Sequence, residues 1–178
     1  MKLATEIIAL IKGPVAIAVA SRDADHFPSL CHAYGCRWDV KEQTLRIFVL
    51  TDEARPVLSN IAANGEVAAV FSDVRTLRSL QIKGRNAHTL VFDTKDARQQ
   101  ESHYRQTSEG LLAAGYPNGP AQGYFDVPVK AGLVTLAFTP ADIYQQTPGP
   151  HAGDRLPGGR LHDNGIGPVG TGAPVMAT

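Results

Sequence analysis

The sequence predicts a mainly β domain of the α+β class, in which antiparallel strands carry the core and helices flank them. Short apolar runs rich in β-branched residues recur along the chain, and polar or Gly-containing turns separate them. Few segments have the one-sided apolar spacing of a helix. The 178 residues, 43% of them hydrophobic, are enough for one core of ordinary size.

Six segments have the composition of strands, and they follow one another in the order of an antiparallel meander. They are Val15–Ser21, Ser29–Trp38, a doubly buried run around Leu45, Ile47 and Val49, Val67–Phe71, Ser79–Leu90 and Leu133–Phe138. Gly84 interrupts the fifth of these strands as a β-bulge would.

Three segments are predicted to be helical. Gly13-Pro14 ends a first helix over Thr5–Lys12, and a second begins at a cap of Thr51 or Asp52 and ends at Asn64-Gly65. A third helix, Thr94–Ala114, is so polar that only Tyr104, Leu111 and Leu112 are expected to pack against the strands.

The composition divides the chain into a globular part, residues 1–146, and a tail, residues 147–178. The tail has eight glycines and five prolines in 32 residues, too little apolar content for a core of its own. We expect it to dock on the globular part or on a partner subunit.

The charge balance excludes several classes of function. Lys plus Arg and Asp plus Glu number 17 each, so no basic excess is present to bind nucleic acid or a membrane surface. Met1-Lys2-Leu3 leads directly into a helical pattern that contains Glu6, unlike a secretory leader. We therefore expect a cytoplasmic protein that binds neither nucleic acid nor membranes.

The cysteines and histidines do not form a metal-binding pattern. Cys31 and Cys36 are five apart in one expected strand, which sends their side chains to opposite faces and predicts reduced, buried thiols. The six histidines lack paired or i, i+4 spacing, so no metal site is expected. The sequence also has no nucleophile elbow, P-loop or dinucleotide fingerprint.

Two segments carry a resemblance to a known family. Residues 51–71 read T-D-E-A-R-P-V-L-S-N-I-A-A-N-G-E-V-A-A-V-F, and residues 78–84 read R-S-L-Q-I-K-G. With the order of strands and helices over residues 10–144, they resemble the FMN-binding split barrel of the pyridoxamine 5'-phosphate oxidase superfamily. The resemblance implies a six-stranded antiparallel split β-barrel, a homodimer with FMN between the subunits, and oxidoreductase activity on a small molecule.

The resemblance also implies a set of cofactor residues. A phosphate that carries nearly two negative charges needs guanidinium groups and hydroxyl donors, whereas the flavin ring needs backbone groups along its edge. The phosphate set is Thr51, Arg55, Arg78 and Ser79. The ring set is the backbone of His32, Ala33, Tyr34 and Leu50. Gln81 is a further cofactor candidate, because the oxidase has a glutamine at the position of Ser79 and Gln81 lies two residues away on the same face. For His32, an ordinary strand histidine remains an equal alternative.

The chain departs from the oxidase itself at several of its basic positions. Residues 31–36, C-H-A-Y-G-C, lack the flanking basic residues of that enzyme, and its basic pair at the helix start falls on Pro56 and Val57. A run of Arg160-Leu161-His162-Asp163 resembles the segment with which the oxidase meets its substrate. Arg160 and His162 are therefore candidate substrate residues, with a chance match in a Gly-rich tail as the alternative.

Three hypotheses follow from the sequence. The first is an FMN-dependent oxidoreductase acting on an unidentified small substrate. The second is a flavin- or haem-binding protein without turnover, a carrier or a stress protein on the same fold. In the third, a deazaflavin replaces FMN.

Overall fold

The computed structural model describes residues 3–117 and 132–157, which form nine strands and three helices. The helices are α1 Thr5–Lys12, α2 Arg55–Asn64 and α3 Thr94–Ala113. The strands are β1 Val15–Arg22, β2 Pro28–Ala33, β3 Cys36–Asp39, β4 Thr44–Leu50, β5 Val67–Asp73, β6 Ser79–Gly84, β7 His88–Val91, β8 Leu133–Phe138 and β9 Asp142–Gln145.

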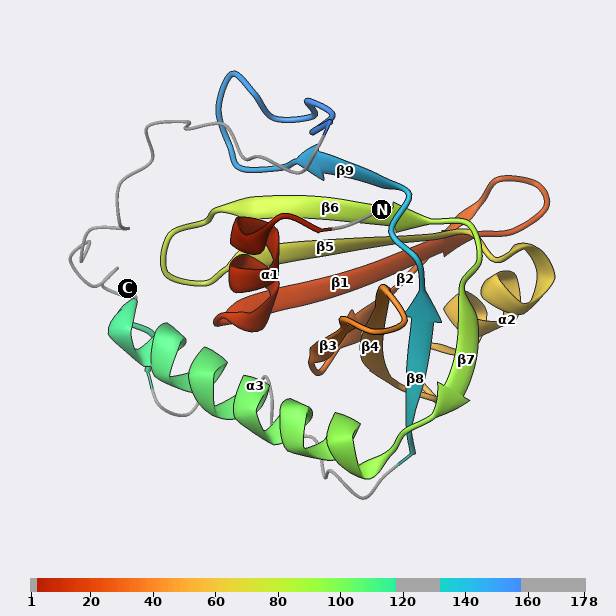
Figure 1. Ribbon diagram of the computed structural model, residues 1–178, viewed down its shortest axis with the longest axis horizontal. Coiled ribbons are helices and arrows are strands. Elements are labelled where there is room, and N and C mark those ends of the chain that lie inside the picture. Colours follow the sequence, from red (N-terminus) through yellow and green to blue (C-terminus); the bar gives the residue numbers. More distant parts are fainter. Residues whose placement is uncertain (1–2, 118–131, 158–178) are drawn as a thin grey trace, which may run out of the picture.

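The strands form two antiparallel sheets (Figure 1). One has five strands in the order β2-β1-β5-β6-β9, and the other has four in the order β3-β4-β8-β7. The mainly antiparallel β class with flanking helices is confirmed. The single six-stranded barrel is not, because the described strands are divided between two sheets and close no barrel.

Two predicted strands are each broken into two, and the halves lie in different sheets. The segment from Ser29 to Trp38 breaks at Gly35, where φ is 145°, a value that suits glycine alone. The segment from Ser79 to Leu90 ends its first half at Gly84 and resumes at His88. These breaks carry the chain from the five-stranded sheet to the four-stranded sheet.

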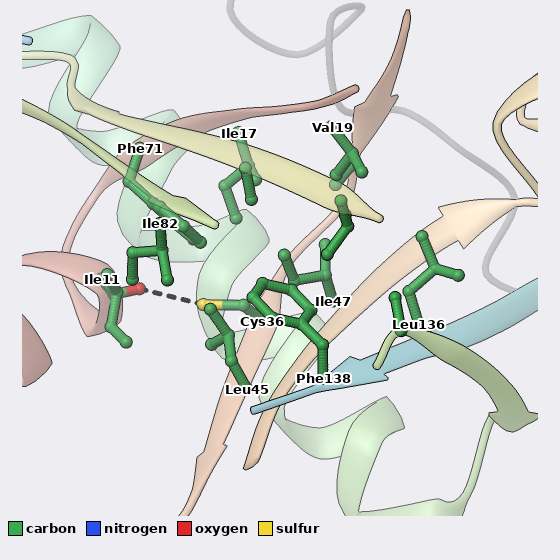
Figure 2. Close-up of a cluster of buried hydrophobic side chains, with 14 of the residues drawn as sticks. Ile11, Ile17, Val19, Cys36, Leu45, Ile47, Phe71, Ile82, Leu136 and Phe138 are labelled. Carbon is green, nitrogen blue, oxygen red and sulfur yellow. Dashed lines mark hydrogen bonds between the residues drawn. The ribbon is translucent and has the colours of Figure 1, made fainter. Parts of the chain in front are cut away.

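The core lies between the sheets and follows the period of two along each strand. Val15, Ile17 and Val19 are buried on β1, while the residues between them are half-buried. Figure 2 shows Ile17 and Val19 with Phe71 and Ile82 of the same sheet, facing Leu45, Ile47, Leu136 and Phe138 of the other. Large apolar side chains thus point inward from both sheets.

Helix α1 packs its Ile7 and Ile11 into this core, and Cys36 forms a hydrogen bond with this helix. The Cys36 thiol donates to the carbonyl oxygen of Ile11 at 3.2 Å (Figure 2). Cys31 and Cys36 are both free and buried, as predicted. The prediction that they lie on opposite faces of one strand is wrong, because the chain breaks at Gly35 and both side chains lie in the core.

Helix α2 begins later than the sequence predicted. Its N-cap is Ala54, which supplies no side-chain hydrogen bond, so Thr51 and Asp52 do not cap it. Pro56 lies in the first turn, and Gly65 ends the helix in the left-handed conformation at φ 69°. The first-turn N–H groups of α2 therefore have no side-chain cap.

Helix α3 buries a polar face, contrary to the expectation that Tyr104, Leu111 and Leu112 pack it. Leu112 is 43% exposed, and the other two are half-buried. The buried residues recur every three or four positions and are Asp96, Gln100, His103, Thr107 and Gly110. These buried positions have the spacing of the buried face of a core helix, but most of their side chains are polar. Asp96 in the first turn contacts the four-stranded sheet, and Gly110 near the end of the helix lies against Pro14 and Val74.

Asp96 anchors this interface. Its carboxylate is fully buried and accepts from Arg37 Nε at 2.8 Å and from Thr135 Oγ1 at 2.9 Å. Asp93 is the N-cap of the helix, and its backbone N–H donates to Asp96 Oδ2, which completes a capping box. The carboxylate is thus satisfied from three elements, which makes its burial tolerable.

Residues that follow β9 pack back on that strand. The N–H of Gln145 donates to the Asp154 oxygen at 2.9 Å, and the N–H of Leu156 donates to the Ile143 oxygen at 2.8 Å. The Leu156 side chain is only 2% exposed and belongs to the core. The first part of the Gly/Pro-rich segment, residues 147–157, is therefore part of the folded unit.

Replacing Gly84 with alanine should destabilise the protein because the new Cβ would collide with the buried Phe138 ring. We expect a loss of about 2 kcal/mol in the free energy of unfolding, measured by urea denaturation. In the Phe138→Leu background, the same Gly84→Ala change should cost much less. An equal loss in both backgrounds would mean that the ring is not the cause.

Protonation of His103 should destabilise the protein in acid. Burial lowers the pKa of His103 from 6.5 to about 4, so below pH 6.5 the unfolded chain binds a proton that the folded chain does not. Stability should fall by about 3 kcal/mol as the pH drops from 6.5 through 4. His103→Gln should flatten urea-measured stability over this range, whereas His88→Gln, at an exposed site, should not. An unchanged slope in His103→Gln would contradict the account.

Candidate functional site

The face of the five-stranded sheet that points away from the core carries two of the predicted cofactor residues in one row. Ala18 lies opposite His32 of β2 and opposite Val70 of β5. Val70 in turn lies opposite Gln81 of β6, which pairs with Tyr144 of β9. Residues paired across antiparallel strands share a face, so His32 and Gln81 belong to the same surface.

This surface is floored by short side chains. We call these six half-buried residues the alanine floor: Ala16, Ala18, Ala20, Ala68, Val70 and Ser72. A sheet with such short side chains allows close approach of a flat ring or of another protein surface. Leu30, opposite Ala20, is 69% exposed beside the floor, and Phe27 at the nearby hairpin is 71% exposed. Exposed apolar side chains thus continue from the alanine floor onto the β1–β2 hairpin.

The predicted ring segment lies on β2, an edge strand of the five-stranded sheet. His32 is exposed on the outer face, whereas Ala33 is buried on the inner one. Because β2 pairs only with β1 in that sheet, its other backbone groups face away from the ladder. The backbone N–H of Tyr34 is already committed, since it donates to the Phe48 oxygen at 2.8 Å.

Tyr34 also uses its side chain within the protein. Its hydroxyl donates to Glu53 Oε2 at 2.8 Å and so ties the end of β2 to the segment before α2. Leu50, at the end of β4, is half-buried, and its carbonyl accepts from the N–H of Ala54 at 2.9 Å. The predicted ring residues therefore lie around the edge of β2. The N–H of Tyr34 and the carbonyl of Leu50 already form hydrogen bonds within the protein.

Thr51 and Arg55 of the predicted phosphate set lie near the start of α2, and both are exposed. The Thr51 hydroxyl donates to the Gly132 oxygen at 2.6 Å, and Arg55 pairs with Asp52 at 2.6 Å. The Asp52 carboxylate raises the pKa of Arg55. Both residues border the uncapped first turn of α2.

Arg78 and Ser79 lie at the β5–β6 turn. Arg78 is exposed and forms no ion pair with any described residue. Ser79 is buried, with its hydroxyl 2.8 Å from Ser72 Oγ and its N–H donating to Thr147 Oγ1. Ser79 is thus engaged inside the protein, and Arg78 projects outside it.

Arg55 and Arg78 do not converge within one chain. Figure 1 shows α2 and the β5–β6 turn at opposite ends of the five-stranded sheet. Asn60 of α2 bonds to Ser21 at one end of β1, whereas Val15 at the other end of that strand pairs beside the β5–β6 turn. At about 3.4 Å per residue, these ends are roughly 20 Å apart. A phosphate held by both arginines therefore requires one from each of two chains.

A group of charged residues that the sequence analysis did not single out lies on the same outer face. Lys83 is two residues beyond Gln81, and its ammonium lies 4.7 Å from the centre of the Tyr144 ring. Arg85 and Arg155 both bind the Asp142 carboxylate, Arg85 at 2.9 Å. Alternate residues of a strand share a face, so the position of Gln81 predicts that Lys83 and Arg85 lie on the outer face as well. Asp142 lies on β9, a strand that the sequence analysis did not predict.

The thiols do not supply a nucleophile. Burial raises the pKa of Cys31 to about 11 and that of Cys36 to about 12, so both are neutral at physiological pH. Within residues 3–117 and 132–157, no group of three or more His, Cys, Asp or Glu side chains is placed to hold a metal ion. None of the described helices combines the length and hydropathy of a membrane span. Arg160 and His162 lie outside the described residues.

The comparisons with known proteins concern the fold. No protein-family model and no curated protein matches the chain. The structure of HupZ from Group A Streptococcus superposes with a TM-score of 0.50 at 21% identity, over 85% of this chain and 100% of that one.

Two other solved structures match at lower TM-scores. A pyridoxamine 5'-phosphate oxidase-related, FMN-binding protein from Nostoc punctiforme has a TM-score of 0.46 at 16% identity, over 82% of this chain and 87% of that one. An F420 reductase has a TM-score of 0.45 at 20% identity, over 76% and 93%. At a TM-score of 0.50 and 21% identity, the match to HupZ shows a shared fold.

Proposed function

We propose that two copies of this chain pair across the alanine floor and hold FMN at the border of that interface, as an oxidoreductase for a small substrate. The observation that carries the proposal is the outer face itself. It is apolar and half-buried, lies beside the edge strand β2, and carries His32 and Gln81 in one row. A flat ring fits such a floor, and a second copy would cover what the ring leaves exposed.

The residues of β2 suit the ring. Outward backbone groups of the edge strand supply donors and acceptors, and the Gln81 amide supplies one of each. When bound, FMN accepts a hydride or two electrons from the substrate. The protein contributes orientation and electrostatics. Burial keeps both thiols neutral, so we assign them no part in the chemistry.

The start of α2 suits the phosphate. Ala54 supplies no side-chain cap to this 10-residue helix, and Pro56 in the first turn has no N–H. Thr51 and Arg55 stand beside the remaining first-turn N–H groups. Such a helix terminus favours an anion through its N–H groups and its dipole. Arg78 of a second copy would complete the set.

A second candidate function is flavin or haem binding without turnover. His32 is exposed on an apolar face beside Leu30, and histidine is a common axial ligand of haem iron. The purified protein separates the candidates by its visible absorption. Oxidised flavin gives two bands, one of them in the blue, and haem gives an intense Soret band. The mass of the bound ligand distinguishes FMN from a deazaflavin.

Replacing Arg55 and Arg78 together with alanine should weaken FMN binding about a hundredfold, because two charge-assisted contacts to the phosphate would be lost. The measurement is titration of the apoprotein by flavin fluorescence quenching. Arg75→Ala/Arg98→Ala is the matched control, since it removes two exposed arginines outside the predicted set. Equal FMN affinity in both double variants would show that the phosphate lies elsewhere.

A further inference from the structure

An open hollow of about 330 Å³ lies on the outer face, where β1 ends and β5 begins. Its floor is made of Ala20, Ala68 and Gly84, and it continues the alanine floor. Arg22, Lys83 and Arg85 line it as well. None of these cations belongs to the phosphate set predicted from the sequence.

The charges around the hollow do not cancel. Arg22 is neutralised by Glu66, with 2.8 Å between Nε and Oε2. Arg85 and Arg155 share one carboxylate, that of Asp142, and their side chains remain 69% and 67% exposed. Hydrogen bonds from the two arginines hold the pKa of Asp142 below its usual range, so this carboxylate is charged at neutral pH. One guanidinium charge is therefore left uncompensated.

Lys83 adds a second uncompensated charge. It lies directly across from Asp142 in the β6–β9 ladder, but its ammonium rests over the Tyr144 ring and forms no ion pair with the described residues. Lys83, Arg85 and Arg155 thus carry three positive charges against the single negative charge of Asp142, a net charge of +2. Of this cluster, Lys83 and Arg85 line the hollow itself.

We propose that this hollow binds the oxyanion group, a phosphate or a carboxylate, of a small molecule whose apolar part lies on the alanine floor. Lys83 and the outward N–H groups of Arg85 contact the anion. Asp142 orients Arg85 from behind, as a carboxylate commonly does for an anion-binding guanidinium. The site does not depend on turnover, and the anion can belong to the cofactor or to a second ligand.

Pyrophosphate is a suitable probe, titrated calorimetrically into the full-length protein at low ionic strength. The wild type should bind it, and Lys83→Gln should bind it about tenfold more weakly, because one charge-assisted contact is lost. Raising the salt to about 0.5 M should also weaken binding, since the cations are exposed and screened. Arg75→Gln, which removes an arginine at the β5–β6 turn, should retain wild-type affinity.

Lys83→Gln/Arg85→Gln should abolish measurable pyrophosphate binding. Lys83→Gln alone leaves both ion pairs of Asp142 intact, so its result stands even if the double variant folds poorly. A wild type that does not bind pyrophosphate, or a Lys83→Gln variant that binds it as tightly as the wild type, would overturn the proposal.

FMN titrations of the same variants identify the source of the anion. If FMN and pyrophosphate weaken together, the hollow holds the flavin phosphate. If pyrophosphate binding is lost and FMN binding is retained, the hollow serves another anionic ligand. A protein that binds pyrophosphate through Lys83 but never binds FMN would refute the proposed flavin function and leave the anion site standing.

Discussion

The passage of the chain from one sheet to the other is the constraint on which this structure depends. Phe138 of β8 packs over Gly84, the last residue of β6, where a larger residue would collide with the ring. Gly35 makes the second passage, at φ 145° and against Phe48, Gln100 and His103. Because both glycines allow close approach, the two sheets face each other across a single core.

Because the two sheets face each other across one core, each sheet has an outer face that the core does not cover. The four-stranded sheet turns its outer face to α3, and polar residues centred on Asp96 fill that contact. The five-stranded sheet points Phe71, Leu80 and Ile82 inward and leaves short side chains outside. No described helix buries that second face as α3 buries the first, and we assign it to a second copy and a flat ligand.

Much of the fold was predictable because local chemistry decides it. Gly13-Pro14 and Gly65 end two helices where expected, and the strands over residues 15–22, 44–50, 67–73 and 133–138 follow their apolar patterns. The division into two sheets was not, because a glycine within a strand pattern does not say whether the chain bulges or leaves the sheet. The buried face of α3 was missed because Gln100, His103 and Thr107 look like solvent-facing residues until Arg37, Asp96 and Thr135 are seen together.

Part of the candidate site was also predictable from the sequence. Alternation along one strand placed Gln81, and the resemblance placed His32, and both lie on one face. That Arg55 and Arg78 lie at opposite ends of a sheet could not be predicted, since their separation depends on strand pairing. The cluster of Lys83, Arg85 and Arg155 was hidden for the same reason: it depends on β9, a four-residue strand with no strong sequence pattern.

The pairing of two copies through the alanine floor is tested most directly by the mass and flavin content of an Ala18→Glu variant. A carboxylate at the centre of that floor would be buried without a partner in the proposed dimer. We predict a wild type at twice the 19.0 kDa of one chain that retains FMN, and a variant at one chain mass without it. Ala113→Glu, on the exposed end of α3, is the control and should behave as the wild type. An Ala18→Glu protein with the wild-type mass and full FMN content would contradict the account.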